Sequence, residues 1–201
     1  MIRTKFDRSV EQNKLATSTV RQSFDRMAAC PRGTWLLDAI ESRKVVCDLI
    51  YVADADAIPG IGRKRPAGFC QEAPRGQHYN VYVVVGYRGE VSQYQCPQGH
   101  KWTVAQALGV HVRPPCPTCR QPSRPGFTNV PRIVIRPLVE IARTTFHELL
   151  HAWFMTEFPS GTGHDTSVEP AVNAFGVTTY SEQGYDARFL AHIKAFAKEI
   201  Q

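Results

Sequence analysis

The stretch TTFHELLHAWF, residues 144–154, lies within a run from 138 to 158 whose apolar side chains predict a helix. Residues four apart lie on one face of a helix, so His147 and His151 can bind one metal ion. Glu148 then points at a water on that ion. This HExxH pattern predicts the active helix of a zinc-dependent hydrolase, and the remaining chain is interpreted around it.

A catalytic zinc ion takes three protein ligands and leaves one position for water. Three downstream residues are candidates for the third ligand: His164, Asp165 and Glu169. Glu148 is expected to take a proton from the activated water, which attacks a peptide carbonyl, and to pass it to the leaving amine. A second group of candidates could donate a hydrogen bond to the developing oxyanion or simply pack before the last helix: Tyr180 and Tyr185.

HELLHA at 147–152, followed by VEPAVNAFG at 168–176, resembles the thermolysin-like gluzincins. The second helix of that family carries a Glu ligand, an Asp one turn later, and then Phe-Gly. The resemblance implies that Glu169 is the third ligand, which is our preferred prediction. Asn173 stands where the family has the Asp that hydrogen-bonds a zinc-bound histidine, so this outer contact would lack a negative charge.

Gly163-His164-Asp165 also resembles the segment that supplies the third histidine in SprT-like proteases, which act on proteins crosslinked to DNA. This second resemblance implies His164 as the alternative third ligand. Those proteases usually place a zinc ribbon after the catalytic helix, whereas the cysteine-rich part of this chain precedes it.

Two short ligand pairs, CPQGH at 96–100 and CPTC at 116–119, have the spacing of a closed tetrahedral zinc site. We expect a structural zinc ion held by Cys96, His100, Cys116 and Cys119, with His111 as an alternative to His100. The segment 94–120 resembles small zinc ribbons. The basic and aromatic residues around it could contact nucleic acid or a protein partner, or could cover its own small core. The alternative to a zinc site is that these cysteines are reduced buried thiols in a proline-rich loop.

The other periodic segments predict an α+β, zincin-like fold with a small mixed sheet, in a single domain of residues 1–201 with a zinc-ribbon insert at about 95–125. In zincins one sheet edge pairs with an extended peptide, and we expect 79–87 or 129–136 to be that edge. Residues 54–78 are expected to form an irregular loop. The remaining expected elements are helices at 8–29, 35–42, 167–175 and 186–200, and strands at 45–52, 79–87, 90–94 and 129–136.

The chain of 201 residues has a formal net charge of +6 and 43% hydrophobic residues, which is ordinary for a globular protein. Basic residues gather at 63–65 and around Arg113, Arg120, Arg124, Arg132 and Arg136, where they could attract polyanions or form solvated surface. No segment has the length of a membrane helix, and the first residues lack the apolar core of a secretory signal. The three cysteines outside the predicted zinc site indicate a reducing compartment. We therefore expect a protein without a membrane partner that is cytoplasmic or delivered into a target cell without a signal peptide.

The preferred function is a zinc metallopeptidase that cleaves a protein substrate, with a bacterial toxin or injected effector as one setting. The alternatives are a SprT-like protease that acts on DNA-bound proteins and a non-enzymatic zinc-binding adaptor. Nothing in the sequence predicts the substrate, the cleavage site or the oligomeric state.

Overall fold

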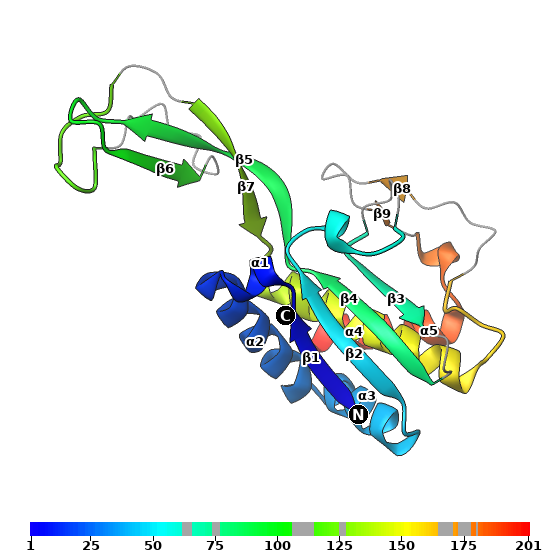
Figure 1. Cartoon of the computed structure of the whole chain (residues 1–201). Helices are drawn as coiled ribbons and strands as arrows, with labels where there is room; N and C mark the ends of the chain where they lie inside the picture. The colour runs from blue at the N-terminus through cyan, green and yellow to red at the C-terminus, as the bar shows by residue number, and fades with distance from the viewer. Residues whose placement is uncertain are drawn as a thin grey trace. The chain divides into compact units, whose positions relative to one another are not determined.

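The computed structural model describes residues 1–61, 66–73, 77–105, 115–124, 128–164, 171–172, 178–179 and 181–201. The chain divides into two compact units, which are connected twice along the sequence. The first unit joins Met1–Tyr87 with Ile135–Gln201, and the second is Arg88–Val134 (Figure 1). The insert expected at about 95–125 lies within the second unit.

A four-stranded mixed sheet forms the framework of the first unit, in the order β1-β2-β4-β3. β1, β2 and β4 run parallel, and β3 runs antiparallel to β4 at one edge. The expected α+β class with a small mixed sheet is therefore confirmed. The strands are β1 (Ile2–Phe6), β2 (Val46–Val52), β3 (Gly68–Glu72) and β4 (His78–Val84).

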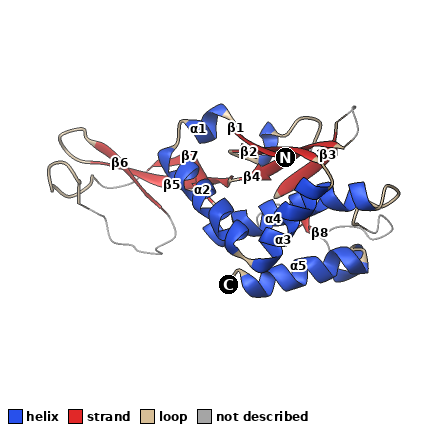
Figure 2. Cartoon of the chain, turned by 90° about the horizontal axis from the view of Figure 1, so that it is seen from below, coloured by secondary structure: helices blue, strands red, loops and turns tan. Residues whose placement is uncertain are grey.

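Helices cover one face of this sheet (Figure 2). α4 packs against β3 and β4, while α2, α3 and α5 pack around α4. The predicted helices at 138–158 and 186–200 are confirmed as α4 and α5. The helices are α1 (Arg8–Glu11), α2 (Lys14–Ala29), α3 (Pro31–Ser42), α4 (Leu138–Glu157) and α5 (Ala187–Glu199).

The prediction of a single helix at 8–29 is wrong, because the helix is interrupted between α1 and α2. The side chain of Asn13 accepts hydrogen bonds from the backbone N–H groups of Leu15 and Ala16, both at 3.1 Å, and so starts a new helix. Pro31 occupies the first turn of α3, where a missing N–H costs nothing, so α3 also begins earlier than expected.

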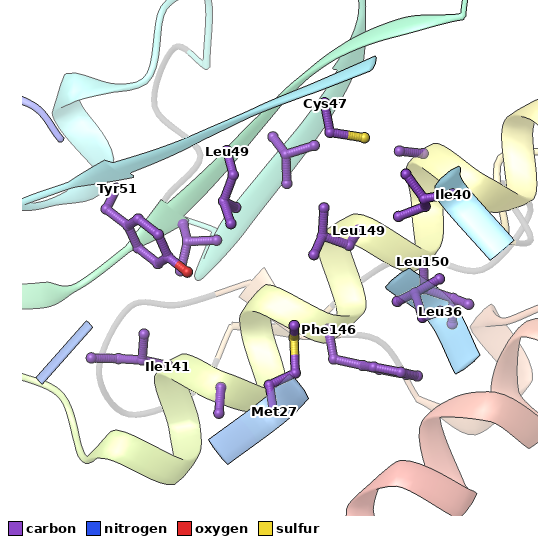
Figure 3. Close-up of a cluster of buried hydrophobic side chains, with 14 of the residues drawn as sticks. Met27, Leu36, Ile40, Cys47, Leu49, Tyr51, Ile141, Phe146, Leu149 and Leu150 are labelled. Carbon is purple, nitrogen blue, oxygen red and sulfur yellow. The ribbon is translucent and has the colours of Figure 1, made fainter. Parts of the chain in front are cut away.

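The main core lies between the four-stranded sheet and the helices that cover it. Cys47, Leu49 and Tyr51 point from alternate positions of β2 toward the helices, where Leu149 of α4 faces them, while Phe146 lies on the other side of α4, toward Met27 and Leu36 (Figure 3). All of these residues are at most 1% exposed. Near the end of β2, the buried Tyr51 hydroxyl lies 3.2 Å from Thr145 Oγ1 of α4. This packing fixes α4 along its length against the sheet.

The opposite face of the sheet carries a smaller apolar cluster of Val52, Ala55, Ile58 and Val84. Ala55 belongs to a short 3-10 helix, Ala55–Ala57, in the connection after β2. On the same side of β2, the buried carboxylate of Asp48 lies 2.9 Å from Lys5 Nζ and 3.1 Å from His78 Nε2. Lys5 comes from β1 and His78 from β4, so Asp48 links three parallel strands.

The second unit contains a three-stranded sheet in the order β6-β5-β7. Tyr94 and Trp102 are direct partners across β5 and β6, and their rings stack with centroids 6.0 Å apart. β6 was not predicted from the sequence. The strands are β5 (Gly86–Gln95), β6 (Lys101–Ala105) and β7 (Thr128–Ile135).

Two further expectations about the elements are wrong. β3 lies within the segment 54–78 that was expected to be an irregular loop. The helix expected at 167–175 is not formed at Ala171–Val172, which is strand β8 and pairs with β9, Thr178–Thr179. The rest of the segment 167–175 lies outside the described residues.

Across the ranges described above, no helix combines the length and the apolar character needed to cross a membrane.

Candidate metal centres

Three histidines of the first unit converge on one point. His151 Nε2 lies 3.0 Å from His147 Nε2 and 2.9 Å from His164 Nε2. The first two residues sit one turn apart on α4, as the sequence predicted, and His164 arrives from the segment after the helix. Three imidazole nitrogens cannot all donate to one another at these distances, so their lone pairs form a donor set for a cation. The group could hold a metal ion.

A backbone carbonyl fixes the orientation of the middle histidine. His151 Nδ1 lies 2.7 Å from the carbonyl oxygen of Thr162. A carbonyl only accepts hydrogen bonds, so Nδ1 carries the proton and Nε2 presents its lone pair to the other histidines. This contact is the kind that orients a metal-binding histidine. Sequence reasoning missed it because a backbone acceptor has no residue signature.

Burial keeps the three imidazoles neutral, which is the form that binds a metal. Burial, and then the proximity of the His164 imidazole, lower the pKa of His147 to about 3. Burial and the two neighbouring imidazoles hold the pKa of His151 well below its ordinary value. Burial also lowers the pKa of His164, although the backbone of Gly184 acts in the opposite direction.

The carboxylate of Glu148 lies beside this group. Its Oε1 is 4.0 Å from His147 Nε2, and the residue is only 7% exposed. Burial raises the pKa of Glu148 to about 8. A bound cation would favour the ionised carboxylate and so oppose this shift. Glu148 is therefore positioned next to the candidate metal site, as expected for a group that exchanges protons there.

Strand β3 passes directly over Glu148 at Gly68. A Cβ atom at this position would lie 2.6 Å from Glu148 Cγ and 2.8 Å from the Tyr82 carbonyl oxygen. Cys70 lies two residues after Gly68, on the same side of β3. Burial raises the pKa of its thiol, and Glu148 adds to this shift. That β3 reaches the site could not be predicted, because no local pattern in the sequence predicts the strand itself.

The structure describes only some of the residues predicted to form the histidine site. His164, the alternative third ligand, joins His147 and His151. Tyr185 is close as well, with its ring centroid 4.8 Å from that of His164. The other site predictions lie outside the described residues: Glu169, Asp165, Asn173 and Tyr180.

The predicted Cys3His group comes together in the second unit. The His100 Nδ1 atom lies 3.5 Å from Cys96 Sγ and 3.7 Å from Cys116 Sγ, and Cys119 Sγ is 3.7 Å from Cys96 Sγ. These four residues could hold a second metal ion. The alternative ligand His111 lies outside the described residues.

Two similar turns shape the Cys3His group. The backbone N–H of Cys96 donates to the His100 carbonyl at 3.0 Å, and that of Cys116 donates to the Gln121 carbonyl at 2.9 Å. Gly99 and Arg120 have positive φ angles of 88° and 61° within these turns. Although burial raises the pKa of Cys116, hydrogen bonds from the backbone of Cys119 and Thr118 lower it to about 6. A thiolate is the metal-binding form of cysteine.

Arg136 is not part of a solvated basic surface, which corrects one expectation. Its side chain is only 13% exposed. It donates to the Val84 carbonyl at 2.8 Å and to Thr144 Oγ1 at 3.0 Å, so it joins the end of β4 to the first half of α4.

Of the two segments expected to be the peptide-binding edge, 79–87 is wrong, whereas 129–136 lies mostly in β7, an edge strand of the sheet in the second unit. β4, which makes up most of the segment 79–87, is paired on both sides, with β2 and with β3. Its backbone hydrogen bonds are therefore already used. The edge of the described sheet beside Glu148 is β3.

Comparisons with protein-family models, with curated proteins and with solved structures find no match for this chain.

Proposed function

We propose that the protein is a zinc-dependent metallopeptidase in which His147, His151 and His164 hold the catalytic zinc ion. The observation that carries this proposal is the convergence of three imidazole Nε2 atoms beside the buried carboxylate of Glu148. Three neutral nitrogen donors are a usual protein ligand set for catalytic zinc, because they leave a fourth position for water or substrate. When bound, zinc would lower the pKa of water and polarise a peptide carbonyl.

The protein residues would supply the proton transfers. Glu148 would take a proton from the attacking water and deliver it to the leaving amine, so its carboxylate must be ionised before each cycle. Tyr185, beside His164, is a candidate hydrogen-bond donor to the oxygen of the scissile carbonyl.

Strand β3 is the proposed binding edge for the peptide. The strand pairs with β4 on one side only among the described strands, and it passes over Glu148 at Gly68. An extended peptide that hydrogen-bonds to β3 would therefore lie along the candidate site.

The decisive experiment replaces Glu148 with Gln. General acid–base catalysis contributes about 10²- to 10⁴-fold to a rate, so Glu148→Gln should lower cleavage of a denatured, labelled protein by at least about 100-fold. Zinc content, measured by atomic absorption, should not change, because the three histidines remain.

Glu157→Gln is the matched control. This residue lies at the end of the same helix and pairs with Arg43 at the surface, 2.9 Å away, so its loss should leave cleavage unchanged. Full activity of Glu148→Gln would contradict the proposed role. A wild-type chain that binds zinc at the histidines but cleaves no unfolded protein would favour a non-enzymatic adaptor.

His164 in the ligand group favours a second candidate function, a SprT-like protease acting on DNA-bound proteins. The resemblance of Gly163-His164-Asp165 to that family and the position of the His164 ring support the same ligand. In this case DNA should stimulate cleavage of a DNA-binding protein, whereas a general metallopeptidase should not respond.

The two proposed third ligands can be separated by metal content. His164→Ala should remove close to one zinc equivalent per chain, because His164 Nε2 is one of the three converging donors. Glu169→Ala should leave zinc content unchanged. The opposite result, with zinc lost only from Glu169→Ala, would restore the gluzincin-like ligand set.

We further propose that Cys96, His100, Cys116 and Cys119 hold a structural zinc ion. The four donors would fill the tetrahedral positions and leave none for a substrate.

A further inference from the structure

We infer that Phe189 of α5 is a positioning residue that holds the three histidines in their metal-binding arrangement. The inference rests on the proposed histidine zinc site. Phe189 has no ligand atom, so it contributes to the site only by shaping it from α5.

Phe189 touches every histidine of the group. Its ring centroid lies 4.4 Å from that of His151, 5.4 Å from that of His147 and 6.0 Å from that of His164. The ring is fully buried. Its plane is tilted by 31° to His151 and stands nearly upright, at 81°, to His147. The aromatic ring therefore forms an apolar wall against imidazoles that come from α4 and from the segment that follows it.

Phe189 also shapes the segment that delivers His164. Gly163 has a φ angle of +82°, and a Cβ atom there would lie 2.6 Å from Phe189 Cδ2. The backbone before His164 thus lies directly on the Phe189 ring, in a conformation that glycine adopts readily. A side chain at position 163 or a smaller one at position 189 would change where His164 sits.

Backbone contacts attach the same part of the chain to the His164 segment. The N–H of Asp186 donates to the Gly163 carbonyl at 3.1 Å, and His164 forms an isolated β-bridge with Tyr185. Asp186 also caps α5, because its side chain accepts from the N–H of Arg188 at 2.9 Å. The start of α5 is therefore fixed to the His164 segment, and Phe189 follows within its first turn.

These contacts predict a specific effect on metal binding. If the imidazoles are held in place before metal arrives, the ion does not have to order them, and its affinity is higher. Removing the ring leaves space in which His151 and His164 can rotate. Contacts outside the ligands typically change metal affinity by about 10- to 100-fold.

Phe196 provides a matched control. It lies on the same helix, is 2% exposed, and stacks on Phe146 of α4 with ring centroids 4.0 Å apart. Phe196→Ala should lower the thermal unfolding temperature about as much as Phe189→Ala, because each removes one buried ring between α5 and α4. In the described structure, however, no ring contact joins Phe196 to the metal-binding histidines.

The experiment measures the zinc dissociation constant of the histidine site by chelator competition, and the visible absorption spectrum of the Co²⁺-loaded site. Phe189→Ala should weaken zinc binding about 10- to 100-fold and shift the Co²⁺ bands, whereas Phe196→Ala should change neither. Phe189→Leu keeps an apolar side chain for folding and should give an intermediate weakening.

Equal effects of Phe189→Ala and Phe196→Ala on zinc affinity, or no effect of Phe189→Leu, would show that Phe189 is only part of the core. A wild-type chain that binds no metal at the histidines overturns this inference together with the proposed function. Metal binding with the predicted Phe189 effect, but without peptide cleavage, overturns the proposed peptidase alone.

Discussion

Gly68 is the residue that allows β3 to pass over the proposed general base. Its missing side chain leaves room for the Glu148 carboxylate, since a Cβ atom would approach Glu148 Cδ to 2.9 Å. The neighbouring Tyr82 carbonyl belongs to the sheet and cannot move without disturbing its hydrogen bonds. At the residue scale, one glycine thus couples the edge strand to the site.

Gly68→Ala should displace the Glu148 carboxylate and lower kcat/KM by about 100-fold, because a shift of about 1 Å in a catalytic group has this order of effect. Zinc content should remain unchanged. The kinetic assay with a labelled protein substrate measures the effect.

The comparison variant is Asp38→Ala, at an exposed position of α3 and outside the proposed peptide-binding strand, which should keep normal kinetics. Normal kinetics in Gly68→Ala as well would mean that the contact with Glu148 has no functional consequence.

At the scale of elements, the sheet that supports α4 depends on a buried charge. Asp48 of β2 is 6% exposed and interacts with Lys5 of β1 and His78 of β4. Burial by itself would raise the pKa of Asp48, but the hydrogen bonds and charges of Lys5 and His78 outweigh it, so the pKa lies below its ordinary value of 3.8. A carboxylate with a lowered folded-state pKa stabilises the fold above its unfolded-state pKa.

Asp48→Asn should therefore be less stable than the wild type at pH 7, by about 1–3 kcal/mol, because a buried charged hydrogen-bond network loses its acceptor charge. The difference should shrink as the pH falls below 3.8 and through the lower pKa of folded Asp48, where the wild type also loses the charge. Urea unfolding at several pH values measures this difference.

Asp25→Asn, an exposed substitution on α2, serves as the comparison and should show a small difference at every pH. A difference for Asp48→Asn that stays constant between pH 7 and the acid range would contradict the proposed role of the charge.

At the scale of the whole molecule, the two groups of candidate metal ligands lie in different compact units. The three histidines belong to the first unit, and Cys96, His100, Cys116 and Cys119 belong to the second. The second unit is inserted between β4 and α4 in the sequence. β3, which passes over Glu148, therefore precedes the insertion, and α4, which carries Glu148, follows it. The two proposed metal sites should therefore be separable by substitution.

Wild-type protein should contain close to two zinc equivalents, and Cys116→Ser should contain close to one. The remaining ion should occupy the histidine site, because all of its ligands lie in the first unit. The substitution should also increase proteolytic cutting within 88–134, since metal binding contributes directly to the folding of small metal-bound modules. Atomic absorption and limited proteolysis measure the two effects.

Cys30→Ser tests whether loss of any buried thiol has the same consequence. Cys30 is buried but belongs to neither donor group, so this variant should retain two zinc equivalents. Two equivalents in Cys116→Ser would remove the proposed structural site.

The elements that could be predicted from the sequence are those with a strong local signal. α4 and α5 repeat apolar residues at helical spacing, and β2 and β4 are rich in β-branched residues. β1 and β3 were missed because their strand conformation depends on pairing with β2 and β4. β1 is mostly polar, with three exposed residues in its middle, and β3 lies in a segment rich in proline, glycine and arginine.

By itself, the sequence determined the pairing of His147 with His151, because the helical repeat places residues four apart on one face. It also determined the two short turns of the Cys3His group. Only the tertiary structure brought His164 into the histidine group, Thr162 to His151, and Gly68 over Glu148. These contacts join segments whose separation is set by the packing of β3 and α5 around α4, and no local repeat in the sequence encodes that packing.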